Sequence, residues 1–150
     1  MRNLLCILLL IFLFSCKKEN LISDIPEIEF ISISPTIVQE YSDEIIITIS
    51  YFDANGDLGE NNPDVKNMFI KDNRNEIEYE YRIPELTPSG SNISIQGNFD
   101  IKINGTGITD SSSSFPLIAH SQKVNYNIYV KDRAGNKSNT ITTSSITIQQ

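Results

Sequence analysis

From Glu27 onward, hydrophobic and polar residues alternate with a period of two, as they do in β-strands that bury one face. The apolar positions hold mostly Ile, Val, Tyr and Phe, which fit a pleated sheet. The pattern predicts seven strands, over residues 28–33, 45–51, 65–70, 77–83, 93–103, 124–130 and 141–148. In the last strand the parity changes between Ile141 and Ile146, as it would in a bulged edge strand. No helix longer than one turn is predicted.

Turn-forming sequences separate these strands, at residues 72–75, 84–90, 105–107 and 134–136. The serine run Ser111–Ser114 is typical of a polar spacer loop. Seven short antiparallel strands within residues 27–150 predict an all-β fold, specifically an immunoglobulin-like antiparallel β-sandwich. Within it, Tyr79 and Tyr81 are in phase with Ile77 and Ile83, so we expect these rings to pack in the core rather than to form a ligand platform.

A different pattern precedes the strands. Arg2 is followed by an unbroken apolar run of eleven residues, Leu4–Phe14. The run is too short to cross a membrane as a helix, which takes about 20 residues, and it has the length of the apolar region of a signal peptide. An ordinary signal peptide and a lipoprotein signal both fit this much of the pattern.

The next four residues, Leu13-Phe14-Ser15-Cys16, resemble the bacterial lipobox, in which a small residue precedes a cysteine that becomes acylated. This resemblance implies that residues 1–15 are removed as a signal peptide. It also implies that Cys16 carries a diacylglycerol and an N-acyl chain, which together hold a protein stably on a membrane.

Residues 16–26 are short and polar, which predicts a lipidated N-terminal tether, and residues 27–150 then form one domain. Lys17, rather than Asp, follows the cysteine. By resemblance to lipoprotein sorting in Gram-negative bacteria, this implies the outer membrane. The sequence leaves open whether the domain faces the periplasm or the cell exterior.

Charge and cysteine content narrow the chemistry of the mature domain. Loss of Arg2 leaves 11 basic against 19 acidic residues, a net charge of −8, so nucleic acid is a poor partner. Cys6 leaves with the signal peptide and Cys16 is acylated, which excludes disulfides and cysteine nucleophiles. The single histidine, His120, makes no catalytic set, and we expect no enzymatic activity.

The segment Tyr51-Phe52-Asp53-Ala54-Asn55-Gly56-Asp57-Leu58-Gly59-Glu60 places side-chain oxygens at alternate positions 53, 55 and 57. In a loop, this spacing lets Asp53, Asn55 and Asp57 converge on a cation that prefers oxygen ligands, such as Ca²⁺. The segment is not an EF-hand, because Leu58 replaces the expected glycine and no helices flank it. Any calcium site here would belong to a β-sandwich loop.

A second segment, Tyr129-Val130-Lys131-Asp132-Arg133-Ala134-Gly135-Asn136-Lys137-Ser138, resembles a turn before the last strand of many bacterial immunoglobulin-like and fibronectin type III-like domains. If residues 45–52 are strand B and 123–131 are strand F, the loops after them lie at the same end of the sandwich. Asp132 then becomes the fourth candidate ligand, and Arg133 and Lys137 are candidates to neutralise the cluster. Alternatively, these Asp and Asn residues are turn formers that bond nearby backbone amides.

The mature chain as a whole resembles small, functionally uncharacterised lipoproteins of Gram-negative, Bacteroidota-type bacteria that carry one immunoglobulin-like or fibronectin type III-like domain. The resemblance rests on residues 52–59, 82–88 and 132–138. It implies a fold and a location but no activity. The favoured hypothesis is a non-catalytic binding or adhesion module with an envelope protein or glycan as partner. The alternative is a structural accessory subunit of an outer-membrane assembly, joined through an open sheet edge at 141–148.

Overall fold

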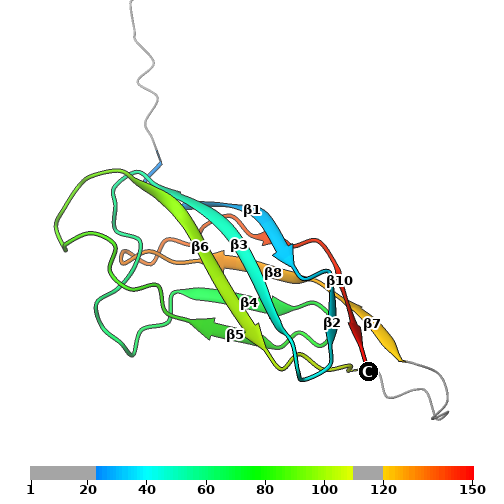
Figure 1. The fold of residues 1–150 in the computed structure, drawn as a ribbon. Coiled ribbons are helices and arrows are strands. Elements are labelled where there is room, and N and C mark those ends of the chain that lie inside the picture. The colour runs from blue at the N-terminus through cyan, green and yellow to red at the C-terminus, as the bar shows by residue number, and fades with distance from the viewer. Residues whose placement is uncertain (1–22, 110–119) are drawn as a thin grey trace, which may run out of the picture.

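The computed structural model describes residues 23–109 and 120–150. The signal segment, Cys16, most of the tether and the serine run lie outside these residues. The described chain is all-β, with ten strands and no helix (Figure 1). The predicted all-β fold is confirmed.

The first sheet contains β1 (Glu27–Ser34), β3 (Glu44–Asp53) and β6 (Ile95–Asn104), in the order β1-β3-β6 with antiparallel pairing. The register of β3 with β6 is unbroken, from Glu44 opposite Asn104 to Asp53 opposite Ile95. Alternate residues of β3, including Ile45, Ile47 and Ile49, are fully buried, while residues between them are half-exposed. The sheet therefore has one buried face and one polar face, as the period of two predicts.

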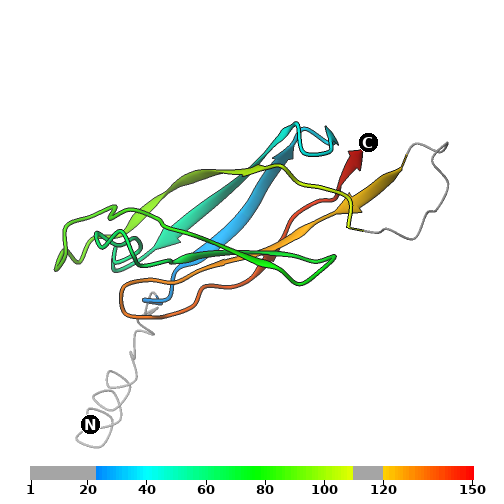
Figure 2. The same cartoon turned by 90° about the horizontal axis from the view of Figure 1, so that it is seen from below.

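The other strands form two further sheets. One has the order β5-β4-β8-β9, from β5 (Glu78–Tyr81), β4 (Met68–Asp72), β8 (Tyr126–Val130) and β9 (Ile141–Thr142). The other has the order β2-β10-β7, from β2 (Ile37–Gln39), β10 (Ile146–Gln149) and β7 (Ser121–Val124), with β2 parallel to β10. Figure 2, seen from below, shows the first sheet as one layer and the β4 and β8 strands as the opposite layer.

The two layers bury a single core between them. Isoleucine dominates it, and Tyr126 is its largest fully buried side chain. The cluster consists of Ile28, Ile33, Val38, Ile45, Ile47, Ile49, Leu58, Met68, Ile70, Ile83, Ile101, Ile103, Val124, Tyr126, Ile128, Val130, Ile146 and Ile148. Leu58 and Ile83 lie outside the strands, so the loops after β3 and β5 are fixed by core packing.

The prediction of about seven strands is wrong in number, because two predicted strands are each divided and β2 was missed. The division occurs where the chain passes between sheets. Tyr126 N–H donates to Thr143 Oγ1 at 3.0 Å, and Thr143 N–H donates to the Tyr126 carbonyl at 2.9 Å. This local pairing ends the ladder of β8 with β9 and separates β9 from β10. β2 has only three residues, too few to show a period.

The predicted open edge at 141–148 is also wrong in part, because β10 lies between β2 and β7. Only the two-residue β9 is at an edge. Beside it, Asn139 exchanges two hydrogen bonds with the backbone of Ile28, at 2.9 and 2.8 Å. The free edge in this part of the chain is therefore limited to the two residues of β9.

The expected burial of the aromatic strand holds at one end only. Tyr81 packs against the core and Ile83 is buried, but Ile77 is 50% exposed and Tyr79 is 38% exposed. Tyr79 lies opposite the buried Ile70, so it is on the inner face. Because β5 is an edge strand with a neighbour on one side only, that face is covered incompletely.

Candidate functional site

Two loops meet at one end of the molecule, after β3 and after β8. Leu58 forms an isolated antiparallel bridge with Asp132, and Arg133 N–H donates to the Asp57 carbonyl at 3.1 Å. The structure thus brings together the two segments that carry the sequence-predicted metal ligands. We call this region, with Asp53, Asp57 and Asp132, the Asp53 end.

Asp53 and Asp57 are only partly satisfied by hydrogen bonds. Asp53 is fully buried, and its Oδ2 accepts a hydrogen bond from Leu58 N–H at 2.6 Å. The other oxygen of Asp53, Oδ1, is buried without a hydrogen-bond partner, and so is Oδ1 of Asp57. In the described part of the chain, these are the two buried side-chain oxygen or nitrogen atoms in this condition. Both belong to residues that the sequence places in a metal site.

The electrostatics of Asp57 reflect its neighbours. Desolvation is the largest effect that raises the pKa of Asp57, and the negative charges of Asp132 and Asp53 raise it further. The Arg133 charge and the backbone N–H of Ala134 lower it, but by less. The ionised form of Asp57 is therefore disfavoured in the folded protein.

Asp132 and Asn55 behave as turn formers. Asp132 Oδ1 accepts from Asn136 N–H at 2.7 Å, and Asp132 Oδ2 accepts from the Asn136 side-chain amide at 2.8 Å. Asn55 Oδ1 accepts from Asp57 N–H at 3.4 Å. The turn interpretation therefore describes Asp132 and Asn55, whereas Asp53 and Asp57 each retain one oxygen that no turn uses.

The cations that sequence suggested as neutralising groups are mostly engaged elsewhere. Arg133 donates from Nη2 to the Gly56 carbonyl at 3.2 Å, and from Nη1 to the carbonyls of Gly59 at 3.2 Å and Thr87 at 3.3 Å. Lys137 places its Nζ 3.7 Å from the ring centroid of Tyr129. Lys137 is thus held by a cation–π contact on the neighbouring strand, and the expectation that it neutralises the carboxylates is not met.

A third segment, residues 84–93, packs against the loop after β3 and was missed by sequence reasoning. Gly56 and Gly59 have φ angles of +72° and +94°. A Cβ at Gly56 would collide with the Ile93 carbonyl, and one at Gly59 with the Pro84 carbonyl. Thr87 Oγ1 also donates to the Gly56 carbonyl. In the sequence, the two glycines are the local signal for a close approach of another segment. A glycine does not identify which segment approaches it.

Other candidate groups do not extend the site. Across residues 23–109 and 120–150, no three His, Cys, Asp or Glu side chains are grouped so that they could hold a metal ion. His120 lies directly before β7 and is half-buried. In the same described residues, no helix is long and apolar enough to cross a membrane.

The fold and these loops define an all-β domain with two carboxylates at one end, each of which has one buried oxygen without a hydrogen-bond partner. No model of a known protein family, no curated protein and no solved structure matches the chain.

Proposed function

We propose that this chain is a lipid-anchored, non-catalytic binding module of the Gram-negative outer membrane, stabilised by calcium. The lipobox-like Leu13-Phe14-Ser15-Cys16 supports the anchor, and residues 16–26 supply the tether. With acyl chains on Cys16, the domain needs no membrane-spanning segment to stay at the membrane. The resemblance to small lipoproteins of Bacteroidota-type bacteria supports the same location.

The domain is proposed to be immunoglobulin-like. Its strand order supports this, because β1, β3 and β6 share one sheet while β4 and β8 share the opposite one. The chain therefore crosses between layers after β3, returns after β5 and crosses again after β6, as in the Greek-key connections of immunoglobulin sandwiches. In such folds, loops gather at the two ends and present binding surfaces.

The observation that carries the calcium proposal is the pair of buried, unpartnered oxygens on Asp53 and Asp57. A buried polar atom without a partner destabilises the fold, and like charges nearby add repulsion. Calcium removes both penalties, because it binds several oxygens from carboxylates, carbonyls and water. We assign Asp53 and Asp57 as ligands, while Asp132 adds negative charge and Asn55 shapes the loop.

Equilibrium dialysis of the purified full chain against micromolar to millimolar calcium tests the metal. The expected result is one Ca²⁺ per chain in the wild type and none in Asp53→Asn/Asp57→Asn. Asp24→Asn/Asp64→Asn is the matched control, since it removes the same charge from exposed positions. Retention of calcium by the Asp53→Asn/Asp57→Asn protein, or its absence from the wild type, would refute the assignment.

Intact-mass analysis of protein extracted from membranes tests the anchor. The expected species begins at Cys16 and carries added acyl mass, and Cys16→Ala should leave an unprocessed or released chain. A Cys16→Ala protein that is still cleaved after Ser15 and remains membrane-bound would exclude the lipoprotein assignment.

The second candidate function is a structural subunit of an outer-membrane assembly. One observation favours it: β6 pairs along ten residues with β3 and has no strand on its other side within the described chain. Long free edges are sites for strand addition by a partner. Purification from gently solubilised membranes separates the candidates, because a stoichiometric protein partner supports the subunit and a monomer that a glycan retains supports the binding module.

A further inference from the structure

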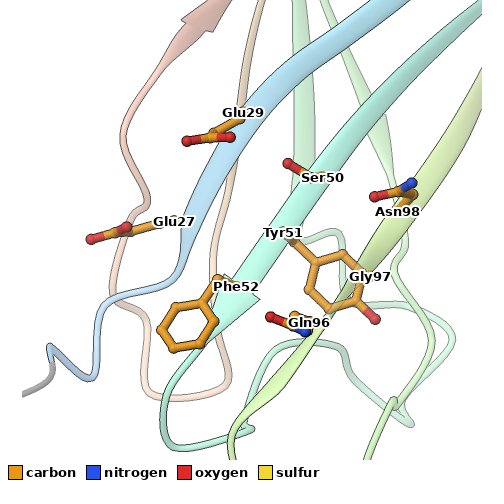
Figure 3. Close-up of a pocket in the computed structure, with 8 residues that line it drawn as sticks. All are labelled: Glu27, Glu29, Ser50, Tyr51, Phe52, Gln96, Gly97 and Asn98. Atoms are coloured by element: carbon orange, nitrogen blue, oxygen red, sulfur yellow. The ribbon is translucent and has the colours of Figure 1, made fainter.

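A shallow groove lies on the outer face of the first sheet, near the ends of the strands where β3 finishes (Figure 3). Its volume is about 470 Å³. β1, β3 and β6 all contribute to its lining, which consists of Glu27, Glu29, Ser50, Tyr51, Phe52, Gln96, Gly97 and Asn98. The set contains aromatic, amide, hydroxyl and carboxylate groups but no cation.

The strand register arranges the outward side chains of the groove in two rows. Phe52 stands between Glu27 and Gln96, and Ser50 stands between Glu29 and Asn98. Tyr51 belongs to the opposite face, where its ring lies against Gly97 and stacks on Phe99 with centroids 4.4 Å apart. Phe52 is thus the single aromatic side chain on the outward face of the groove.

The same sheet face provides an internal comparison. Farther along β3 and β6, the polar side chains pair with each other: Thr48 Oγ1 donates to Asp100 at 2.7 Å, and Lys102 Nζ donates to Glu44 at 3.0 Å. In the groove, the five polar side chains make no hydrogen bond to another described residue. They are Glu27, Glu29, Ser50, Gln96 and Asn98. Polar side chains on the distant half of the face therefore hydrogen-bond to each other. Those in the groove leave their donors and acceptors free around the Phe52 ring.

We propose that this groove binds a glycan, either neutral or bearing amino groups. Sugar hydroxyls both donate and accept hydrogen bonds, so they complement a mixture of amides, a hydroxyl and carboxylates. The polarised C–H groups on one face of a pyranose ring complement the negative face of Phe52. Glu27 and Glu29 carry negative charge with no cation in the lining, which favours an ammonium group and disfavours uronates and sulfates.

The position of the groove agrees with a glycan rather than an added protein strand. The groove lies on the face of the sheet over β3, which is paired on both sides, whereas a protein strand would add at the free edge of β6. β1 begins at the groove, with Glu27 only eleven residues beyond Cys16, so the extended tether spans at most about 40 Å. A domain anchored this way holds the groove within reach of envelope polysaccharide. This inference rests on the binding-module part of the proposed function and is independent of calcium.

The test uses the full chain in detergent and three soluble oligosaccharides: glucosamine oligomers, N-acetylglucosamine oligomers and oligomeric uronate. Titration calorimetry should show binding of the first two, with the amine form tighter, and no binding of uronate. Phe52→Ala should weaken binding about tenfold, and Phe52→Tyr should restore it. Glu27→Gln/Glu29→Gln should abolish the preference for the amine form. Thr48→Val, on the self-paired half of the same face, is the matched control and should bind as the wild type does.

Two results would overturn the proposal: no binding of any of the three oligosaccharides, or binding that Phe52→Ala leaves unchanged while the variant remains folded by its melting temperature. The first of these results, combined with binding of oligolysine, would show that the groove is a cationic-peptide site. A failure of this kind leaves the binding module in place if another envelope glycan retains the anchored chain as a monomer, whereas a stoichiometric protein partner would favour the structural subunit. If neither a partner nor a glycan is found, the binding module itself fails.

Discussion

The two ends of the molecule differ in whether a buried carboxylate is paired with an arginine. At the end away from Asp53, Asp72 is 1% exposed and pairs with Arg74, whose Nε and Nη2 donate to it at 3.0 and 2.6 Å. The remaining Arg74 donor, Nη1, binds the Gly107 carbonyl and Gln122 Oε1, each at 2.8 Å. This end, which we call the Asp72 end, is electrostatically complete within the chain.

The Asp53 end also has an arginine, but uses it differently. Arg133 directs its guanidinium to backbone carbonyls and lies 3.7 Å from Glu85, while Asp53 and Asp57 keep unpartnered oxygens. The number of charges nearby does not decide whether a carboxylate is satisfied; the direction of the donors does. The comparison teaches that the Asp72 end satisfies its buried carboxylate within the chain, whereas the Asp53 end leaves two carboxylate oxygens without a partner, which is the basis of the proposed calcium site.

The largest effect is expected from Arg74→Met at the Asp72 end. It leaves Asp72 buried without its counter-charge, so the free energy of unfolding should fall by about 3–5 kcal/mol in denaturant titrations. The double variant Asp72→Asn/Arg74→Met should recover part of this loss, because no unpaired charge remains. A loss below about 1 kcal/mol in the single variant would show that the Asp72 end is not held by this ion pair.

The next effect is the response of the Asp53 end to calcium. At a hundredfold excess over its dissociation constant, calcium should stabilise the fold by about 2.7 kcal/mol, raising the melting temperature by roughly 10 °C. Asp53→Asn/Asp57→Asn should abolish the shift, and Asp24→Asn/Asp64→Asn should retain it. Scanning calorimetry in calcium and in chelator provides the measurement, and equal wild-type melting temperatures would leave the Asp53 end without a metal.

A smaller difference in stability is expected between two glycine variants that test the close approach of residues 84–93 to the Asp53 end. Gly59 and Gly135 both have positive φ, but a Cβ at Gly135 meets no atom within 4 Å, whereas one at Gly59 collides with the Pro84 carbonyl. Gly135→Ala should therefore cost only the left-handed backbone penalty, about 1–2 kcal/mol. Gly59→Ala should cost about 1–3 kcal/mol more, from the collision. If Gly59→Ala and Gly135→Ala lower the free energy of unfolding in urea equally, residues 84–93 do not pack closely against Gly59.

Periodicity predicted the all-β fold and the course of β1, β3 and β6 well, because long half-exposed strands repeat the signal many times. It failed at β2, which has only three residues, and at the divisions near Asn125 and Thr143, where side-chain hydrogen bonds decide the pairing. The burial of Tyr79 was also wrong, because alternation identifies a face but not whether another sheet covers it.

The sequence predicted which loops of the candidate site lie together, because strand topology decides this. Assigning residues 45–52 and 123–131 to strands that end together placed Asp53, Asp57 and Asp132 at one end. The sequence did not reveal that Asn136 satisfies Asp132, nor that Arg133 binds carbonyls of Gly56, Gly59 and Thr87. These contacts depend on side-chain direction and on a segment more than 40 residues away. The groove around Phe52 was missed for a related reason, since only the strand register brings its rows together.

The smallest effect is expected from Asp57→Asn. This variant tests most directly the proposal that a cation from outside the chain binds the Asp57 carboxylate. The folded-state pKa of Asp57 is raised above 3.8, so without metal its contribution to stability is full below that pH and declines as pH rises through the raised pKa.

Melting temperatures of the wild type and of Asp57→Asn, recorded from pH 3 to 8 in chelator and then in calcium, provide the measurement. In chelator, Asp57→Asn should match the wild type at the acid limit and melt about 2–4 °C higher at pH 7, because it removes the repulsion. In calcium at pH 7 the order should reverse, with the wild type more stable. A variant less stable than the wild type in chelator at pH 7, together with no reversal in calcium, would contradict the account.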